Sequence, residues 1–420
     1  MSGNPLRHAV TRMHGRDPHE QNRVSSPLEL FFDLTFAISF GVAAGLYDQA
    51  VSSGHWVTGL ISFGFSMFAV IWAWINFSWF ASAYDTDDWV FRLVTMVQMF
   101  GVLILSMGLG SVFTSIQAGS HVDNRVMVFG YVIMRVALIF QWLRAAKQDP
   151  SRRSTCLSYA KYLAIAQLGW ILVIILNTSV QLMFAMITPL FILEMLTPVI
   201  AERKSRTPWH AHHIAERYAL LVIIALGECL VGTTDALRAV VAEDGWSIET
   251  MAVGLLGTVL AFTMWWLYFV LPTGTALHHR RNRSFVFGYS HIFVFSSITA
   301  VGAGMRIYAS YLAGDSPVSK LTVIMSIAIP VAIYTLMLLF LYGYMLKIDT
   351  LHLWIAAVCL VVTAGSILLV AVGSPMTLSL AMLAIPPALA IILDERIGHK
   401  HRAAALESLA RSKTIDHPVD

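Results

Sequence analysis

Long apolar stretches recur along almost the whole chain, and short polar segments separate them. A helix rises about 1.5 Å per residue, so a stretch of about 20 apolar residues crosses the roughly 30 Å of a bilayer's hydrocarbon core. Twelve stretches meet this length, at approximately 28–47, 56–80, 90–114, 124–144, 157–177, 180–200, 213–237, 249–271, 284–310, 321–346, 351–372 and 376–394. The pattern predicts an all-α, polytopic helical integral membrane protein with about 12 transmembrane helices.

Composition supports this class and excludes several functions. Of the 420 residues, 57% are hydrophobic and 13% are charged, whereas soluble domains have roughly 25% charged residues. The sequence contains no Walker A loop, nucleophile elbow, Cys-x-x-Cys pair or Rossmann fingerprint. We therefore expect no ATP-driven motor, no cofactor, no resident metal and no nucleic-acid partner. The loops are short, so any chemistry must take place in or at the membrane.

The basic residues predict the orientation. They concentrate in the termini and in alternate loops, at 7–23, 144–161, 203–206, 280–283, 347 and 396–413. The opposite loops hold only Arg125, Arg238 and Lys320, with Arg306 near the end of a span. Cytoplasmic loops of membrane proteins are enriched in Lys and Arg. We expect both termini to be cytoplasmic, in a bacterial inner membrane.

Two similar segments indicate an internal repeat. Trp74-Ile-Asn-Phe77 and Trp266-Leu-Tyr-Phe269 each precede a short polar loop and a new span. Because a shift of six spans preserves orientation, we predict two pseudo-repeated six-helix halves, as in several transporter folds. The predicted division is a cytoplasmic tail at 1–24, a first half at 25–201, a linker at 202–208, a second half at 209–396 and a second cytoplasmic tail at 397–420, with a helical piece at 403–410.

Carboxylates at the start of span 1 are the first candidate site. Glu29 and Asp33 are four residues apart and so share one helix face. Two such carboxylates could bind a cation or share a proton, since like charges in low dielectric disfavour double ionisation. The alternative is that they are rim charges paired with Arg217 or Arg23.

Charged and titratable residues also lie inside other spans. Glu228 is twelve residues beyond Glu216, or about 18 Å of helix rise, and intramembrane carboxylates usually mark ion or proton pathways. Its alternative role is a buried ion pair with Arg135, which lies halfway through span 4. His291 is a candidate proton relay or a structural histidine. Glu194 is a candidate for a rim function or for pairing with Arg203.

Two clusters mark the predicted cytoplasmic rim. The first contains His213, Glu216 and Arg217, for which metal binding, salt bridging between the halves and a cytoplasmic gate all remain open. The second contains Asp85 and Asp88 in an acidic loop. That loop could lock to the basic loop at 280–283 or cap the start of span 3.

Four stretches in order resemble the bacterial low temperature requirement protein A (LtrA) family. They are Glu29-Leu-Phe-Phe-Asp33-Leu, Asp85-Thr-Asp-Asp88-Trp, His213-Ile-Ala-Glu216-Arg217 leading to Gly227-Glu228, and Tyr289-Ser-His291. The similarity covers about residues 24–395, with Cys229 standing where Ser is expected and Thr35 where an aliphatic residue is expected. The resemblance implies a multi-pass bacterial membrane protein associated with growth in the cold, and it supplies no mechanism.

Together these features favour a secondary-transporter-like protein with a proton- or cation-coupled carboxylate pathway. In this interpretation Glu29, Asp33, Glu228 and His291 hold or relay the cation, and Arg135 is their counter-charge. Its partners would be the lipid bilayer and an unidentified small solute or ion. Whether it also forms a homo-oligomer is left open by the sequence. The alternatives are a non-transporting membrane protein that supports the envelope in the cold, and an intramembrane enzyme acting on lipid. Between an enzyme and a protein without enzymatic activity, we expect the latter.

Overall fold

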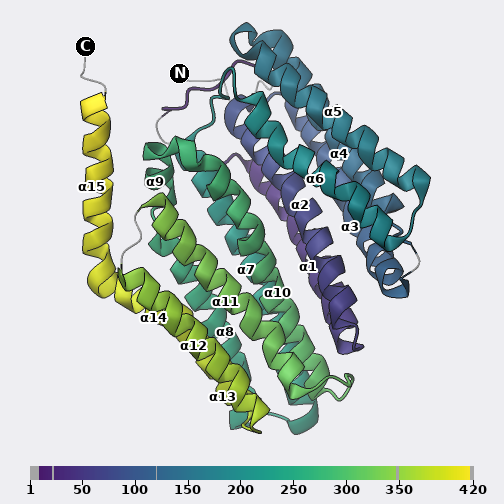
Figure 1. Cartoon of the computed structure of the whole chain (residues 1–420), viewed down its shortest axis with the longest axis vertical. Coiled ribbons are helices and arrows are strands. Elements are labelled where there is room, and N and C mark those ends of the chain that lie inside the picture. Colours follow the sequence, from purple (N-terminus) through teal and green to yellow (C-terminus); the bar gives the residue numbers. More distant parts are fainter. Residues whose placement is uncertain (1–8, 21–22, 120, 347–349, 417–420) are drawn as a thin grey trace. The chain divides into compact units, whose positions relative to one another are not determined.

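The computed structural model describes residues 9–20, 23–119, 121–346 and 350–416, and every regular element within these residues is a helix (Figure 1). Twelve helical segments are long and apolar enough to cross a membrane. The predicted class of polytopic helical membrane protein with 12 spans is therefore confirmed. The predicted repeat of two six-helix halves stays a prediction.

The chain forms two compact units. Unit 1 contains residues 1–42 and 69–214, and unit 2 contains residues 43–68 and 215–420. Helices α1 (Pro27–Ser52) and α2 (Trp56–Tyr84) contribute to both units, because their connected ends at 43–68 belong to unit 2. The predicted division of the chain at 202–208 stays a prediction.

Unit 1 is built mainly from helices that follow one another in the chain. They are α3 (Trp89–Ala118), α4 (Arg125–Gln148), α5 (Arg153–Leu176) and α6 (Val180–Ala201), with a short 3-10 turn at Pro150–Arg152. Each packs against the next. Gly101 and Gly108 on α3 and Gly130 on α4 let the two backbones approach closely, since a methyl group at Gly101 would lie 2.8 Å from the Gly130 carbonyl oxygen. Small residues commonly serve this purpose between membrane helices.

Unit 2 contains the remaining helices. They are α7 (Ala211–Asp244, in unit 2 from Ala215), α8 (Ile248–Val270), α9 (Thr273–His279), α10 (Ser284–Leu312), α11 (Lys320–Met345), α12 (Thr350–Ala371), α13 (Met376–Leu383), α14 (Ile385–Leu393) and α15 (His399–Asp416). Helices α10, α11 and α12 pack in chain order, and α13 and α14 pack on both α12 and α8.

The last predicted span, 376–394, is not one continuous helix. It divides into α13 and α14 around Ala384, where Pro386 and Pro387 follow; proline lacks the N–H that a helix interior requires. A π-helical turn at Asp394–Gly398 then leads into α15, which turns away from α14 (Figure 1). Arg402 fixes this bend by donating to Asp394 Oδ2 at 2.5 Å and to the Val270 carbonyl at 2.7 Å.

Candidate functional site

Glu29 has two roles at the start of α1. Ser26 precedes the helix and the Glu29 N–H lies 3.3 Å from its hydroxyl, while Glu29 Oε2 accepts the Ser26 N–H at 2.9 Å. This reciprocal arrangement is a capping box, and Pro27 occupies the first helical position. The same Oε2 lies 3.2 Å from His213 Nε2, with both side chains buried. The predicted rim residue His213 and the predicted pathway residue Glu29 are thus brought together.

Asp33 lies one turn farther along α1 and is fully buried. Its Oδ1 accepts a hydrogen bond of 2.6 Å from the indole N–H of Trp74 on α2. Sequence analysis treated Trp74 as part of a repeat and missed this contact. Glu29 and Asp33 therefore lie on a buried face of α1, where a carboxylate requires polar partners.

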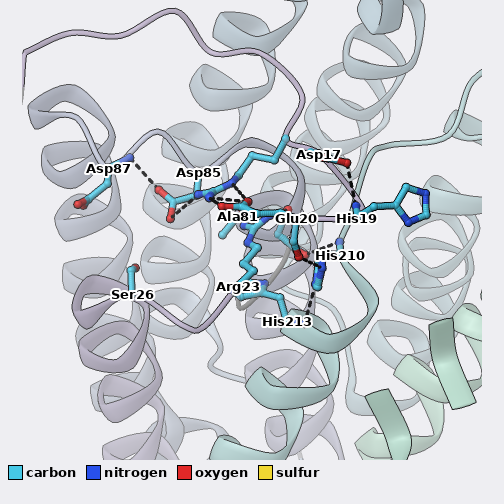
Figure 2. A network of polar contacts seen from close by, with 12 residues as sticks. Asp17, His19, Glu20, Arg23, Ser26, Ala81, Asp85, Asp87, His210 and His213 are labelled. Carbon is cyan, nitrogen blue, oxygen red and sulfur yellow. Dashed lines mark hydrogen bonds and ion pairs between the residues drawn. The ribbon is translucent and has the colours of Figure 1, made fainter. Parts of the chain in front are cut away.

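A polar network links the N-terminal segment to the end of α2 (Figure 2). The buried Arg23 donates to the Ser82 carbonyl at 2.6 Å, a group that the helix C-terminus leaves unpaired, and to the Ala81 carbonyl at 3.1 Å, which also accepts the Asp85 N–H. The Arg16 N–H donates to the Ala83 carbonyl at 2.9 Å. The described part of the predicted tail is therefore bound along unit 1.

Asp85 belongs to this network and is almost fully buried. Its Oδ1 accepts the Asp87 N–H at 2.8 Å, and its Oδ2 is 4.0 Å from Arg16. Burial and the negative charge of Glu29 raise the pKa of Asp85 to about 7. Burial and the positive charge of Arg16 lower the pKa of Arg23 to about 10. The network thus contains a carboxyl group that titrates near neutral pH.

Asp88 caps α3, as one of the predicted alternatives stated. Its Oδ1 accepts the Phe91 N–H at 2.8 Å, and its carboxylate forms an ion pair with Arg144 of α4. The Thr11 N–H donates to its other oxygen at 3.1 Å. Burial tends to raise the pKa of Asp88, but the bonds from Arg144 and the backbone outweigh it and lower the pKa to about 2. The predicted lock to 280–283 stays a prediction.

His210 fixes the start of α7. Its Nε2 is 2.9 Å from the Glu20 carbonyl, an acceptor, so this nitrogen carries the proton. Its Nδ1 then accepts the His213 N–H at 3.1 Å, and its own N–H donates to the Ser82 hydroxyl at 3.0 Å. Burial lowers the pKa of His210. The neutral ring acts as a helix cap that joins α7, α2 and the N-terminal segment (Figure 2).

Arg135 and Glu194 form a fully buried ion pair in unit 1. Arg135 Nη2 is 2.6 Å from Glu194 Oε2, which also accepts the Tyr131 hydroxyl at 2.7 Å. The indole of Trp170 donates to Glu194 Oε1 at 2.9 Å. Two predictions are corrected here, because the partner of Arg135 is Glu194 rather than Glu228, and that of Glu194 is Arg135 rather than Arg203. Arg135 lies on α4 and Glu194 on α6, and the two side chains meet beside Trp170 of α5.

Glu228 pairs instead with Arg306 of α10, at 2.9 Å between Oε2 and Nη2. Arg306 Nε also lies 3.5 Å from Asp235 Oδ2, about two turns farther along the same face of α7. Asp48, at the end of α1, interacts electrostatically with Arg306 and Asp235. Its carboxylate also accepts hydrogen bonds from the hydroxyl groups of Ser52 and Ser310, at 2.9 and 3.4 Å. We call Asp48, Glu228, Asp235 and Arg306 the unit 2 acid cluster.

Close helix packing positions this cluster. A methyl group at Gly302 of α10 would lie 2.6 Å from the Glu228 carbonyl oxygen of α7, so α10 passes tightly against α7 one turn before Arg306. Gly227, the residue before Glu228, has no heavy atom within 4 Å of the place where a side chain would begin. Asp48, Asp235 and Arg306 were not predicted as site residues. The signal was present, since Asp235 and Arg306 are charges in the last turns of their predicted spans and Asp48 directly follows another.

His291 is fully buried in unit 2 and fully hydrogen bonded. Its Nδ1 is 2.7 Å from the Phe287 carbonyl and therefore carries the proton, and its Nε2 accepts the Tyr268 hydroxyl at 2.9 Å. Tyr218 packs edge-on against the ring, with centroids 4.7 Å apart. These contacts favour the structural alternative for His291.

The remaining predicted rim residues lie in unit 2, where Arg217 is fully buried and Glu216 is half-buried. Among the residues that the structure describes, no group of three or more His, Cys, Asp or Glu side chains is arranged to hold a metal ion.

The fold defines a multi-pass helical membrane protein with charged residues buried within its spans. The chain belongs to the bacterial low temperature requirement A (LtrA) family, whose model matches residues 24–386. It is also 24% identical over 313 residues to an uncharacterized protein of Rhizobium meliloti (strain 1021), covering 70% of this chain and 72% of that protein. No solved structure matches the chain.

Proposed function

We propose that this protein is a secondary carrier whose transport is coupled to a proton or another small cation. The observation that carries the proposal is the unit 2 acid cluster. Three carboxylates within membrane-spanning helices, Asp48, Glu228 and Asp235, surround one guanidinium, that of Arg306. If these four groups and Arg238, whose guanidinium is 4.0 Å from Asp235, are all ionised, they have a net charge of −1, which is costly in a membrane. Bound protons or a bound cation would neutralise this charge.

The pair formed by Glu29 and His213 in unit 1 supports the same function. A histidine titrates near neutral pH, so a buried carboxylate bonded to it can exchange a proton without leaving a permanent charge unpaired. The pair lies at the end of the spans that we predict to be cytoplasmic, close to the N-terminal network. In this proposal both termini are cytoplasmic, and Glu29 with His213 passes protons between the cytoplasm and the carrier.

Flux measurements in proteoliposomes test the proposal. A pH-sensitive dye inside the vesicles would report proton entry under an imposed pH gradient, and a Na⁺- or K⁺-selective dye under a gradient of that ion would test the other cations. Glu228→Gln and Glu29→Gln remove charge with little change in shape, and glutamine also preserves the capping box at position 29. Asp123→Asn is the matched control, because Asp123 pairs with the exposed Arg125.

We expect Glu228→Gln and Glu29→Gln to abolish cation flux and Asp123→Asn to leave it unchanged. Unchanged flux in both buried variants would contradict the proposal. The second candidate is a membrane protein without transport activity, and the pair of Arg135 and Glu194 favours it, because this pair is fully neutralised and buried. An absence of flux for all the cations tested would favour that candidate.

A further inference from the structure

Helices α7 and α8 of unit 2 separate along a groove. They touch where Thr233 meets Gly257, since a methyl group at Gly257 would lie 2.6 Å from the Thr233 methyl carbon. Two cavities lie along these helices. The first, of about 510 Å³, is lined by residues such as Gly227, Phe262 and Trp266, and the second, of about 380 Å³, is lined by Thr233 itself. Leu230 lines both cavities, so they adjoin at this residue, and we call the two together the groove.

The groove is apolar and opens sideways. Leu230, Phe262 and Trp266 are 41%, 59% and 51% exposed, so the side chains that line the groove are also accessible from outside the unit. None of the described residues lining either cavity is charged. Because α7 and α8 are membrane-spanning segments, the medium outside them is hydrocarbon. A hollow of this kind in a bilayer selects a flexible apolar chain over a polar solute.

The length of the groove fits one chain of a lipid. Its lining residues on α7 extend from Ile223 to Leu237, fourteen residues that correspond to about 21 Å of helix rise. Half of the roughly 30 Å hydrocarbon core is about 15 Å. A single acyl chain from one leaflet would therefore lie within the groove along its whole length.

The second cavity has the polar side chains that suit a lipid headgroup. Thr234 and Thr258 line it together with Trp246, and tryptophan favours the boundary between hydrocarbon and water. Arg238 follows the groove residue Leu237, and its side chain is 79% exposed. Its distance to Asp235 is 4.0 Å, the limit of an ion pair, so its guanidinium is accessible to a phosphate, which it can bind through two hydrogen bonds.

We propose that the groove between α7 and α8 is a binding site for a membrane phospholipid, with one acyl chain along Leu230 and Gly227 and the phosphate at Arg238. Gly227 has no heavy atom within 4 Å of the place where a side chain would begin. It therefore leaves the space that the chain occupies. The site does not depend on cation transport, and a bound lipid would fix the separation of α7 and α8 beside Glu228.

Groove-filling variants test this site. Gly227→Leu places a side chain in the groove, where its Cβ has no heavy atom within 4 Å, and it replaces a helical glycine by a better helix former, so folding is expected to persist. Gly64→Leu is the matched control, since Gly64 is also helical and has no atom within 4 Å. Arg238→Glu is the second test variant, because it reverses the charge at an exposed position outside the hollow.

The first measurement is native mass spectrometry of each protein after delipidation in mild detergent, counting the phospholipids that stay bound. The second is a titration with a phospholipid that carries bromine atoms at the middle of its chain, which quenches the fluorescence of tryptophans such as Trp265 and Trp266 on contact. We expect wild type and Gly64→Leu to retain one phospholipid and to show quenching that saturates near one equivalent.

We expect Gly227→Leu to lose the retained phospholipid, and Arg238→Glu to weaken its binding by about tenfold, the effect of about 1.4 kcal/mol. The proposal is overturned if wild type retains no phospholipid, or if Gly227→Leu retains as much as Gly64→Leu does. Neither result depends on flux, so failure of this site and failure of the carrier proposal are distinguishable.

Discussion

Loss of the Glu194 charge is expected to destabilise unit 1 severely. Arg135 and Glu194 are both about 1–2% exposed, and 2.6 Å separates their charged groups. In Glu194→Gln the new amide can still accept from Tyr131 or Trp170, so the main loss is the neutralising charge. Removing one partner of a buried ion pair costs about 3–5 kcal/mol, because the other charge stays buried and uncompensated. The equilibrium constant for unfolding should therefore rise by about two to four orders of magnitude.

Cysteine accessibility offers the assay. All three cysteines are free and buried, and Cys156 is the one that lies in unit 1. With Cys229→Ala and Cys359→Ala as background, a thiol-reactive dye reports the unfolding of unit 1 through Cys156. Asp123→Asn is the control, since an exposed pair contributes about 0–1 kcal/mol.

A double variant separates charge from packing. Arg135→Gln with Glu194→Gln removes both charges and keeps hydrogen-bonding groups at both positions, so it should be more stable than Glu194→Gln alone. The reasoning is refuted if Glu194→Gln unfolds within about 1 kcal/mol of wild type, or if the double variant is no more stable than the single one.

Three further predictions concern stability. Burial and the charge of Glu29 raise the pKa of Asp85 to about 7 in the folded protein, whereas an aspartate in the unfolded chain has a pKa of about 3.9. The protonated Asp85 therefore contributes stability that is fully present below about pH 3.9 and is lost as the pH rises through about 7. Asp85→Asn should thus raise the unfolding midpoint at pH 8 and change it little at pH 4, and an equal shift at both pH values would contradict this. Gly130→Ala should cost about 1–3 kcal/mol, because its methyl group would meet the backbone of α3, whereas Gly110→Ala, with open space around it, should be neutral or stabilising; equal denaturation midpoints would count against the packing argument. Tyr268→Phe leaves the buried Nε2 of His291 without its donor and should cost about 1–3 kcal/mol in chemical unfolding, and a neutral result would show that the bond contributes little.

Local sequence features predicted the fold well because membrane spans follow from length and hydropathy alone. The start of α1 was also readable, since Ser26 and Glu29 have the spacing of a capping box and Pro27 lies between them. The break in the last span follows from Pro386 and Pro387. Each of these features depends on residues within a few positions of one another.

The charge pairs could not be predicted in the same way. Arg135 and Glu194 are 59 residues apart, and Glu228 and Arg306 are 78 apart. Which carboxylate faces which guanidinium depends on which helices are neighbours and on their rotation, and span lengths contain neither. The assignment of Glu228 to Arg135 was wrong for this reason, since Arg135 is paired with Glu194 and Glu228 with Arg306.

The rate of proton entry into liposomes that contain wild-type protein, compared with the rate for Glu228→Gln, tests the central claim most directly. The proposal predicts entry that exceeds protein-free vesicles, responds to the imposed pH gradient and falls to the protein-free rate in the variant. Equal rates in wild type and Glu228→Gln, with both proteins folded and inserted, would contradict a cation pathway through the unit 2 acid cluster.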